Sequence, residues 1–257
     1  MQTLAQSPAN VTVISDADKN ETLIMPESLH TTPSIQIVDD QAANVLNGTL
    51  EAKAGARAQE LEDAQFEMLE ELARNAEFRD NDTGQHIERV GQLAGLVARA
   101  AGLPEQRCEL IRQAAKLHDI GKIGIPDNIL LKPGKLLAGE VARMRFHTIW
   151  GAKILAASRF PVIQLAAEIA MHHHERWDGT GYNGMSGERI PLAVRIATLA
   201  DVFDVLTHAR TYKNAWPLEY ALVEIKSQSG RRFDPELVEI FLSDRFQPGL
   251  SCLQSLG

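Results

Sequence analysis

Residues 117–127 read LHDIGKIGIPD, a stretch that places His118 and Asp119 side by side and follows them with Gly121 and Gly124. The residues from Pro104 onward have helical spacing, so the pair lies at the end of a predicted helix. Glycine allows the backbone to leave helical geometry there. We therefore expect both side chains to enter one pocket from a helix end.

Helices are predicted on both sides of this stretch, and no alternating strand pattern of convincing length occurs beyond Asp82. Four of the later helices begin at a proline, a residue tolerated in the first turn. The predicted fold is therefore all-α, a helical bundle over residues 81–257. The expected helices cover residues 82–101, 104–118, 138–157, 161–174, 191–207, 217–227 and 235–242.

The N-terminal part is expected to carry no complete domain. Residues 1–34 are rich in Ser, Thr, Asn and Pro and lack periodicity, which is typical of a mobile tail. The segment SIQIVDD, Ser34–Asp40, resembles the first strand and acidic pair of a response-regulator receiver domain. A helical pattern already begins near Ala58, so we interpret residues 1–50 as a tail with a receiver-like remnant and expect no phosphoacceptor site.

Residues 58–78 form a predicted amphipathic helix, within a linker assigned to residues 51–80. Leu61, Met68, Leu69 and Leu72 lie among acidic residues with a heptad trace. Such a helix can pair with a second copy, which would give a homodimer. Packing onto its own domain is the alternative, and it is the one we favour.

The composition excludes several classes of protein. The formal net charge of −8 argues against a DNA- or RNA-coating surface. No apolar run approaches the roughly 18 residues of a membrane span, and residues 1–20 lack a secretory signal pattern. Cys108 and Cys252 lie far apart, as in a protein of a reducing compartment. A cytoplasmic protein is predicted.

Histidines lie on the apolar faces of the predicted helices. His86 continues the stripe of Val90 and Leu93, while His173 and His174 continue apolar rows of the helix over 161–174. One such histidine alone is more often a hydrogen-bonded core residue than a metal ligand.

Asp201 also has mostly apolar helical neighbours, and a lone buried carboxylate is expensive. Five imidazoles and two carboxylates would be costly to bury unpaired, and mixed nitrogen and oxygen ligands suit Fe, Mn, Co, Ni or Zn. Two ions about 3.5–4 Å apart favour phosphoester hydrolysis. The predicted ligands are His86, His118, Asp119, His147, His173, His174 and Asp201.

Five motifs in this order resemble those of the HD-GYP branch of the HD-domain phosphohydrolases, over roughly residues 80–245. The motifs are DTGQHIERV (82–90), LHDIGKIGIPD (117–127), FHTIWG (146–151), HHERWDGTGYN (173–183) and LADVFDVLT (199–207). The resemblance implies an all-helical fold, a two- or three-metal centre and cleavage of cyclic di-GMP to pGpG, sometimes on to GMP. The implied cofactors are two divalent ions, Fe or Mn.

The resemblance also implies roles for single residues. The seven predicted ligands would hold the ions, with Asp119 and Lys122 as catalytic residues. Lys122, Tyr182, Arg210 and Lys213 would contact the substrate. A surface lysine remains the alternative for Lys122, and a solvated helix end explains Arg210 and Lys213 almost equally well.

The chain departs from the family pattern at three positions. Asn183 follows Gly181-Tyr182 where proline is usual, which predicts a freer loop and weaker binding or turnover. Asp82 stands where some relatives carry a glutamate ligand, so we favour two ions over three. His172 lies outside the motif, and Glu175 is expected to orient a ligand imidazole.

Three functions follow as hypotheses. The leading one is a metal-dependent cyclic di-GMP phosphodiesterase in bacterial second-messenger signalling. The second is a weakly active or inactive module that binds metal and nucleotide and regulates signalling partner proteins. The third is a hydrolase of another nucleotide phosphoester, because the metal centre by itself does not distinguish the base.

Overall fold

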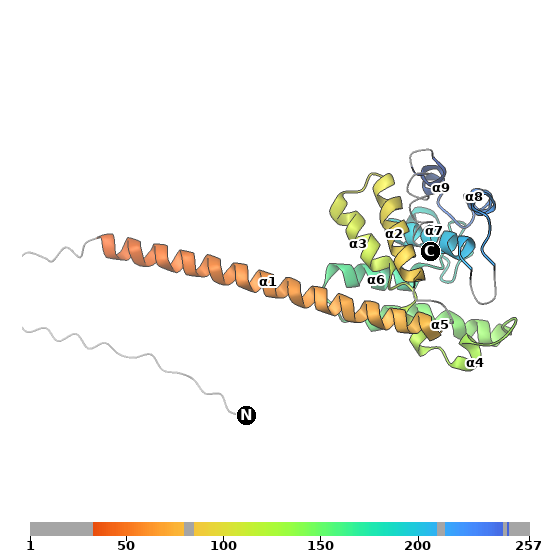
Figure 1. Ribbon diagram of the computed structural model, residues 1–257, viewed down its shortest axis with the longest axis horizontal. Coiled ribbons are helices and arrows are strands. Elements are labelled where there is room, and N and C mark those ends of the chain that lie inside the picture. The colour runs from red at the N-terminus through yellow and green to blue at the C-terminus, as the bar shows by residue number, and fades with distance from the viewer. Residues whose placement is uncertain (1–32, 80–84, 210–213, 244–245, 247–257) are drawn as a thin grey trace, which may run out of the picture. The chain divides into compact units, whose positions relative to one another are not determined.

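The computed structural model describes residues 33–79, 85–209, 214–243 and 246 (Figure 1). These residues form helices and no strand, so the all-α fold class is confirmed. The α-helices are α1 (Pro33–Arg79), α2 (His86–Ala100), α3 (Glu105–Ala115), α4 (Asp127–Leu130), α5 (Ala138–Leu155), α6 (Pro161–His172), α7 (Leu192–Thr207), α8 (Leu218–Ser227) and α9 (Pro235–Leu242), and the 3-10 helices are η1 (Ile120–Gly124) and η2 (Gly187–Arg189).

Helix boundaries agree with the predicted ones within a few residues, except in α1. Pro161 and Pro235 are the first residues of α6 and α9, while Pro191 and Pro217 directly precede α7 and α8. The single turn of α4 was not predicted, because four residues are too few for a periodic signal.

The chain divides into two units, residues 1–54 and 55–257. In the first unit, the strand predicted over Ser34–Asp40 is wrong, since α1 begins at Pro33 and runs through this segment. A single strand has no neighbour to accept or donate its backbone hydrogen bonds, whereas a helix satisfies them locally. Residues 40–54 are exposed on all sides of the helix. Of the tail predicted over residues 1–34, residues 1–32 lie outside the described residues, and the last two belong to α1.

In the second unit, the remaining turns of α1 pack one face against the domain. Phe66 and Leu69 contact the hydrophobic core. Leu61 and Met68 are 66% and 67% exposed, and Leu72 is also exposed. Packing onto the domain, the favoured alternative, is therefore correct for one face of the helix, while most of the predicted apolar stripe stays uncovered.

Charged side chains also join α1 to the domain. The Lys116 ammonium of the segment after α3 is buried and lies 3.3 Å from Glu70 of α1 and 2.9 Å from Glu88 of α2. A buried ammonium is tolerated only when it is paired. Lys116 therefore ties the positions of α1 and α2 to the end of α3.

Arg79, the last residue of α1, binds the segment that follows His118 and Asp119. Its guanidinium donates hydrogen bonds to the carbonyl oxygens of Ile123 and Ile125, at 3.0 and 3.1 Å, and pairs with Asp127 at 2.6 Å. The end of α1 is thus attached to η1 and to the first residue of α4.

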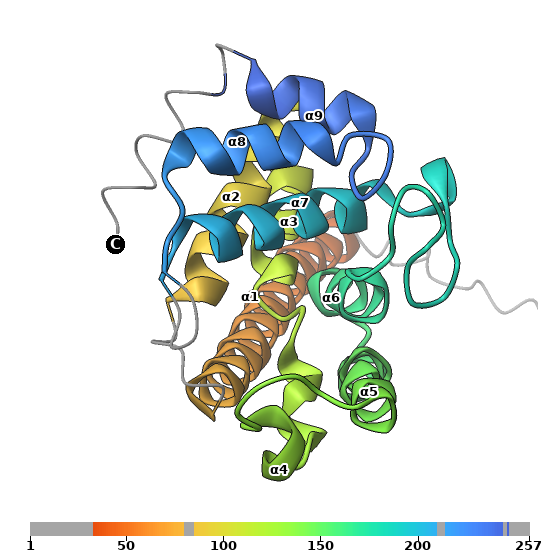
Figure 2. The same cartoon turned by 90° about the vertical axis from the view of Figure 1, so that its right-hand side faces the viewer.

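The hydrophobic core lies between α2, α3, α6 and α7. Helix α2 packs on α3 and α7, α3 packs on α6, and α5 packs on α6 and η1. Figure 2 shows α5 and α6 side by side, with α8 and α9 beyond α7. Apolar residues at helical spacing supply the contacts. Among them are the fully buried Val90, Ile111, Ile163, Ile196 and Phe241.

A close backbone approach places η1 against α5. A Cβ atom on Gly121 would lie 1.9 Å from the carbonyl oxygen of His147 and 2.4 Å from the backbone nitrogen of Gly151. No side chain fits in that space, so glycine is required for steric reasons. The approach brings the segment of His118 and Asp119 next to the helix that carries His147.

We predict that Gly121→Ala pushes η1 away from α5 and destabilises the protein by about 3 kcal/mol or more, since overpacking against backbone cannot relax easily. Chemical denaturation measures the loss. Gly139→Ala in α5 is the matched control, because a Cβ at Gly139 meets nothing within 4 Å. Equal stability of the two variants would contradict the steric role of Gly121.

Candidate metal centre

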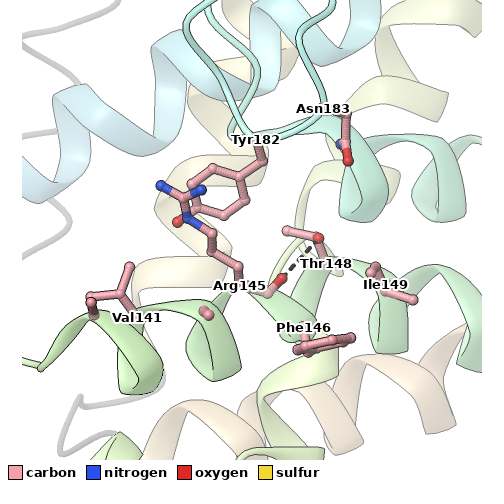
Figure 3. A pocket seen from close by; sticks show the side chains of 9 residues that line it. Val141, Arg145, Phe146, Thr148, Ile149, Tyr182 and Asn183 are labelled. Atoms are coloured by element: carbon pink, nitrogen blue, oxygen red, sulfur yellow. Dashed lines mark hydrogen bonds between the residues drawn. The ribbon is translucent and has the colours of Figure 1, made fainter.

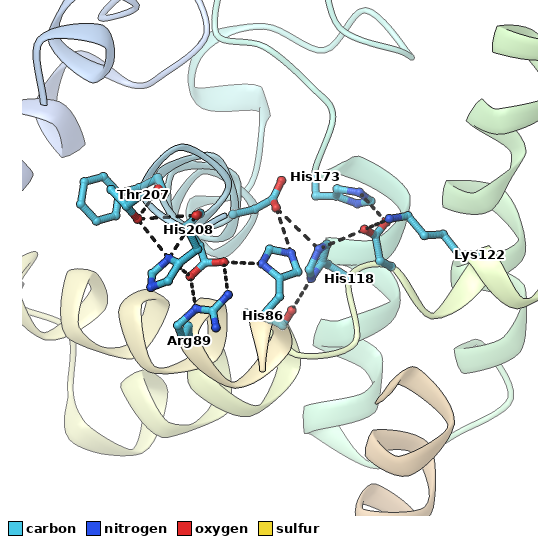
Figure 4. A network of polar contacts seen from close by, with 12 residues as sticks. His86, Arg89, His118, Lys122, His173, Thr207 and His208 are labelled. Atoms are coloured by element: carbon cyan, nitrogen blue, oxygen red, sulfur yellow. Dashed lines mark hydrogen bonds and ion pairs between the residues drawn. The ribbon is translucent and has the colours of Figure 1, made fainter. Parts of the chain in front are cut away.

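Five segments bring the seven predicted ligands together. His86 opens α2, His118 and Asp119 link α3 to η1, and His147 lies on α5. His173 and His174 follow α6, and Asp201 lies on α7. Figure 4 shows His86, His118 and His173 next to one another, with Lys122 at one end. The side chains form two groups that could each hold a metal ion, one of His86, His118 and Asp201 and one of Asp119, His147, His173 and His174.

The Asp119 carboxylate lies between the two groups. One oxygen, Oδ2, is 3.3 Å from Nε2 of His118. The other, Oδ1, is 3.3 Å from Nε2 of His147 and 3.5 Å from Nε2 of His173. The two oxygens of Asp119 thus face different groups, so this carboxylate could ligate an ion in each.

Backbone carbonyls fix the orientation of three imidazoles. Nδ1 of His118 is 2.9 Å from the carbonyl oxygen of Ala115, and Nδ1 of His147 is 2.7 Å from that of Met144. His173 makes the same contact with Ala170 at 3.0 Å. Because a carbonyl can only accept, each Nδ1 carries the proton and each Nε2 presents its lone pair.

These lone pairs face one another without a proton between them. Nε2 of His147 and Nε2 of His173 are 3.3 Å apart. Nε2 of His118 and Oδ1 of Asp119 are buried and have no hydrogen-bond partner within the described part of the chain. Buried polar atoms are rarely left unsatisfied. The donor set thus fits divalent cations, which accept several such lone pairs at once.

Burial and charge shift the pKa values of the imidazoles in opposite directions. Burial lowers the pKa of His147 to about 4 and holds the pKa of His174 well below its ordinary value. Burial alone would also lower the pKa of His86, but hydrogen bonds and charges from Asp201 and Asp204 raise it to about 9. His147 and His174 are therefore neutral and ready to ligate, whereas a cation must displace a proton from His86.

Lys122 lies beside the Asp119 carboxylate, with Nζ 3.0 Å from Oδ2. Burial alone would raise the pKa of Asp119, but the charge of the neighbouring Lys122 ammonium helps to hold it well below its ordinary value. The carboxylate is thus ionised. The structure places Lys122 at the centre rather than on a distant surface.

Asp204 is a functional residue that the sequence analysis missed. Its carboxylate is buried and lies 2.6 Å from Nδ1 of His86, and Arg89 donates to it at 2.6 and 3.0 Å. Asp204 therefore accepts a hydrogen bond from Nδ1 of His86 and orients its ring, as backbone carbonyls do for His118, His147 and His173. The available signal was its position three residues after Asp201, on the same helix face.

Glu175 does not orient an imidazole as predicted, and the Asn183 loop is not left free. The buried Glu175 carboxylate accepts hydrogen bonds from the backbone N–H and side-chain amide of Asn183, at 2.7 and 2.9 Å. The backbone N–H of Met185 donates to its other oxygen at 2.9 Å. Hydrogen bonds from amide N–H groups to a carboxylate are charge-assisted, so the loop is anchored at the residue where freedom was expected.

Tyr182 is held over the centre by this loop. Its ring lies 4.6 Å from the ring of His174, centroid to centroid. His172 ends α6 and belongs to neither metal-ligating group of the described residues. Asp82, Arg210 and Lys213 lie outside the described residues, so their predicted roles stay predictions.

Fold and site define an all-helical domain whose histidine and aspartate cluster could hold divalent metal ions. The sequence pattern of the HD domain family matches residues 60–237, which is more than half of the chain. The chain belongs to the HD domain family, as the resemblance predicted.

The chain is also similar to individual proteins of known sequence or structure. It is 46% identical over 207 residues to the cyclic di-GMP phosphodiesterase response regulator RpfG of Xanthomonas campestris, covering 80% of this chain and 55% of that one. It is 44% identical over 184 residues to the 3′3′-cGAMP-specific phosphodiesterase 2 of Vibrio cholerae, covering 71% and 35%.

A crystal structure of a cyclic GMP-AMP specific phosphodiesterase of Vibrio cholerae has a similar fold, with a TM-score of 0.51 and 24% identity over 73% of this chain and 52% of that one. The chain thus spans about half or less of the length of these three proteins.

We predict that Asp204→Asn weakens metal binding at the His86 group by about ten- to a hundred-fold, the usual effect of losing a partner that orients a ligand. Asparagine keeps an acceptor for Nδ1 but removes the charge. Titration of the apoprotein with Mn²⁺ measures the affinity, and Asp63→Asn on the exposed face of α1 is the control. Unchanged affinity in Asp204→Asn would refute the positioning role.

Proposed function

We propose that the chain is a metal-dependent phosphodiesterase that hydrolyses cyclic di-GMP to pGpG, and on to GMP, in bacterial second-messenger signalling with partner proteins. The similarity to RpfG supports the substrate. The observation that carries the reaction type is the Asp119 carboxylate, because its two oxygens face two groups of imidazole ligands.

The proposed ligands are the seven predicted ones, with two ions, Fe or Mn. Bound as a pair, such ions lower the pKa of water and neutralise charge on the scissile phosphate. Asp119 holds the two groups at a fixed separation, and the imidazoles keep their Nε2 atoms turned inward. Asp82, the candidate ligand to a third ion, has no role in this proposal.

Lys122 is the proposed catalytic cation beside the ions. Its ammonium contacts Oδ2 of Asp119 at 3.0 Å, so a phosphate held at the centre lies within reach of the same charge. A fixed cation stabilises the negative charge that develops on phosphoryl oxygens in the transition state. Tyr182, Arg210 and Lys213 complete the proposed substrate contacts.

We predict that Asp119→Ala abolishes hydrolysis of cyclic di-GMP and lowers the bound metal below the wild-type content, because both groups lose their shared charged ligand. The assay uses anaerobically purified protein supplied with Fe or Mn, with products resolved by chromatography and metal measured by mass spectrometry. Asp63→Ala is the control.

Unchanged metal content in Asp119→Ala would refute the ligand assignment. Metal bound by the wild type without turnover of any cyclic dinucleotide would instead favour the second hypothesis, a binding module.

A second candidate substrate is 3′3′-cGAMP, which the similarity to the Vibrio cholerae enzyme favours. The metal centre itself contacts phosphate and does not read the base. Parallel assays with the two cyclic dinucleotides therefore decide between them, and the higher kcat/KM identifies the substrate.

We also propose a cytoplasmic location, in keeping with a nucleotide substrate. None of the helices formed by the described residues is both long and apolar enough to cross a membrane.

The exposed stripe of α1 supports a homodimer. Leu61, Met68 and Leu72 follow one another at steps of seven and four, the spacing of a coiled-coil seam. At about 100° per residue, Met68 lies about 100° around the helix from the packed Leu69, so the exposed stripe runs beside the packed face. We propose that a second copy of α1 covers this stripe.

We predict that Met68→Asp converts the dimer to a monomer in light scattering after size exclusion, because it places like charges in the seam. Ala56→Asp, on another exposed face of α1, is the control and keeps the dimer. A wild-type protein that is monomeric at tens of micromolar would overturn the proposed dimer.

A further inference from the structure

A cavity of about 500 Å³ lies beside the metal centre and contains none of its proposed ligands. Helix α5 forms most of its wall, and the anchored loop closes one side (Figure 3). Apolar residues predominate, and one basic side chain, Arg145, enters the cavity. The lining consists of Ala138, Val141, Ala142, Arg145, Phe146, Thr148, Ile149, Tyr182 and Asn183.

The cavity adjoins the metal centre at Tyr182 and Arg145. Tyr182 lines it and packs on the ring of His174, one of the proposed ligands, at 4.6 Å. On α5, Arg145 precedes His147 by two residues, and the rings of His147 and His174 are 5.1 Å apart. A group joined to a phosphate at the centre by a single sugar therefore lies next to this cavity.

Arg145 is held in a defined place without a carboxylate partner. Its guanidinium carbon lies 4.5 Å from the centroid of the Tyr182 ring, a cation–π contact (Figure 3). No ion pair of Arg145 with an acidic residue occurs within the described ranges. Its guanidinium also hydrogen-bonds the Tyr182 hydroxyl, and the remaining N–H donors of its planar fork are available to a ligand.

The chemistry of the lining matches a guanine base. Val141, Phe146 and Ile149 offer apolar contact to the flat face of a purine. The Arg145 fork suits the O6 and N7 acceptors of guanine, which arginine contacts in pairs. Adenine carries an N6 amino group in place of O6. This amino donor would face the N–H donors of Arg145, so no hydrogen bond could form there.

We propose that this cavity binds one guanine base of a cyclic dinucleotide whose phosphodiester lies at the metal centre, and that Arg145 selects guanine over adenine. The inference rests on the proposed phosphodiesterase function and names the residue that reads the base at that site.

The test compares cyclic di-GMP with cyclic di-AMP in metal-loaded wild type, Arg145→Met and Arg143→Met. Arg143 is an exposed neighbour on α5 outside the cavity lining, so it controls for the loss of one positive charge. Arg145→Met is expected to reduce the kcat/KM preference for cyclic di-GMP by about ten- to a hundred-fold, mainly through KM, as the loss of a bidentate contact implies. Arg143→Met is expected to keep the wild-type preference.

Calorimetric binding of hydrolysis-resistant phosphorothioate analogues of both dinucleotides separates this inference from the proposed activity. Guanine-selective binding that depends on Arg145, in a protein without turnover, would contradict the proposed activity alone. Equal losses for both nucleotides in Arg145→Met, or an unchanged preference, would overturn the guanine site and leave the cavity to a protein partner.

Discussion

The geometry of the Asp119 carboxylate is the constraint on which the rest of the site depends. Its two oxygens can face two ligand groups only if the segment after α3 lies against α5, where His147 is carried. That closeness requires Gly121, whose hydrogen atom occupies a space too small for any side chain. One backbone contact between the segments that carry Asp119 and His147 therefore sets the separation of the two groups, and Arg79 holds the first segment from the end of α1.

A shared local rule prepares the imidazoles for ligation. His118, His147 and His173 each place Nδ1 on the carbonyl oxygen three residues earlier. The side chain folds back along the helix onto this carbonyl, and because a carbonyl can only accept, the contact fixes the tautomer of each ring. His86 opens α2, and for its ring the side chain of Asp204 supplies the acceptor at Nδ1.

Periodicity predicted most of the fold and the inward-facing site residues, because helical spacing and proline positions are local signals. Pairings across the chain are not local. His86 and Asp204 are 118 residues apart, and nothing in either motif indicates that they meet. The Ser34–Asp40 segment failed for a related reason, since β-branched residues favour a strand only where neighbouring strands exist. The proposed role of Arg145 could not be predicted from the sequence, because it depends on a cavity that α5 forms together with the Tyr182 loop.

Asn183 shows how a departure from a family pattern can be compensated within the same turn. A proline at this position fixes the backbone by its ring but has no N–H to donate. Asn183 instead gives the buried Glu175 carboxylate two donors, and Met185 gives a third. Hydrogen bonds to a charged acceptor contribute more than neutral ones, so the anchoring restricts the loop by a different physical means. Tyr182 consequently keeps its contact with His174, and the wall of the cavity beside the metal centre is retained without the proline.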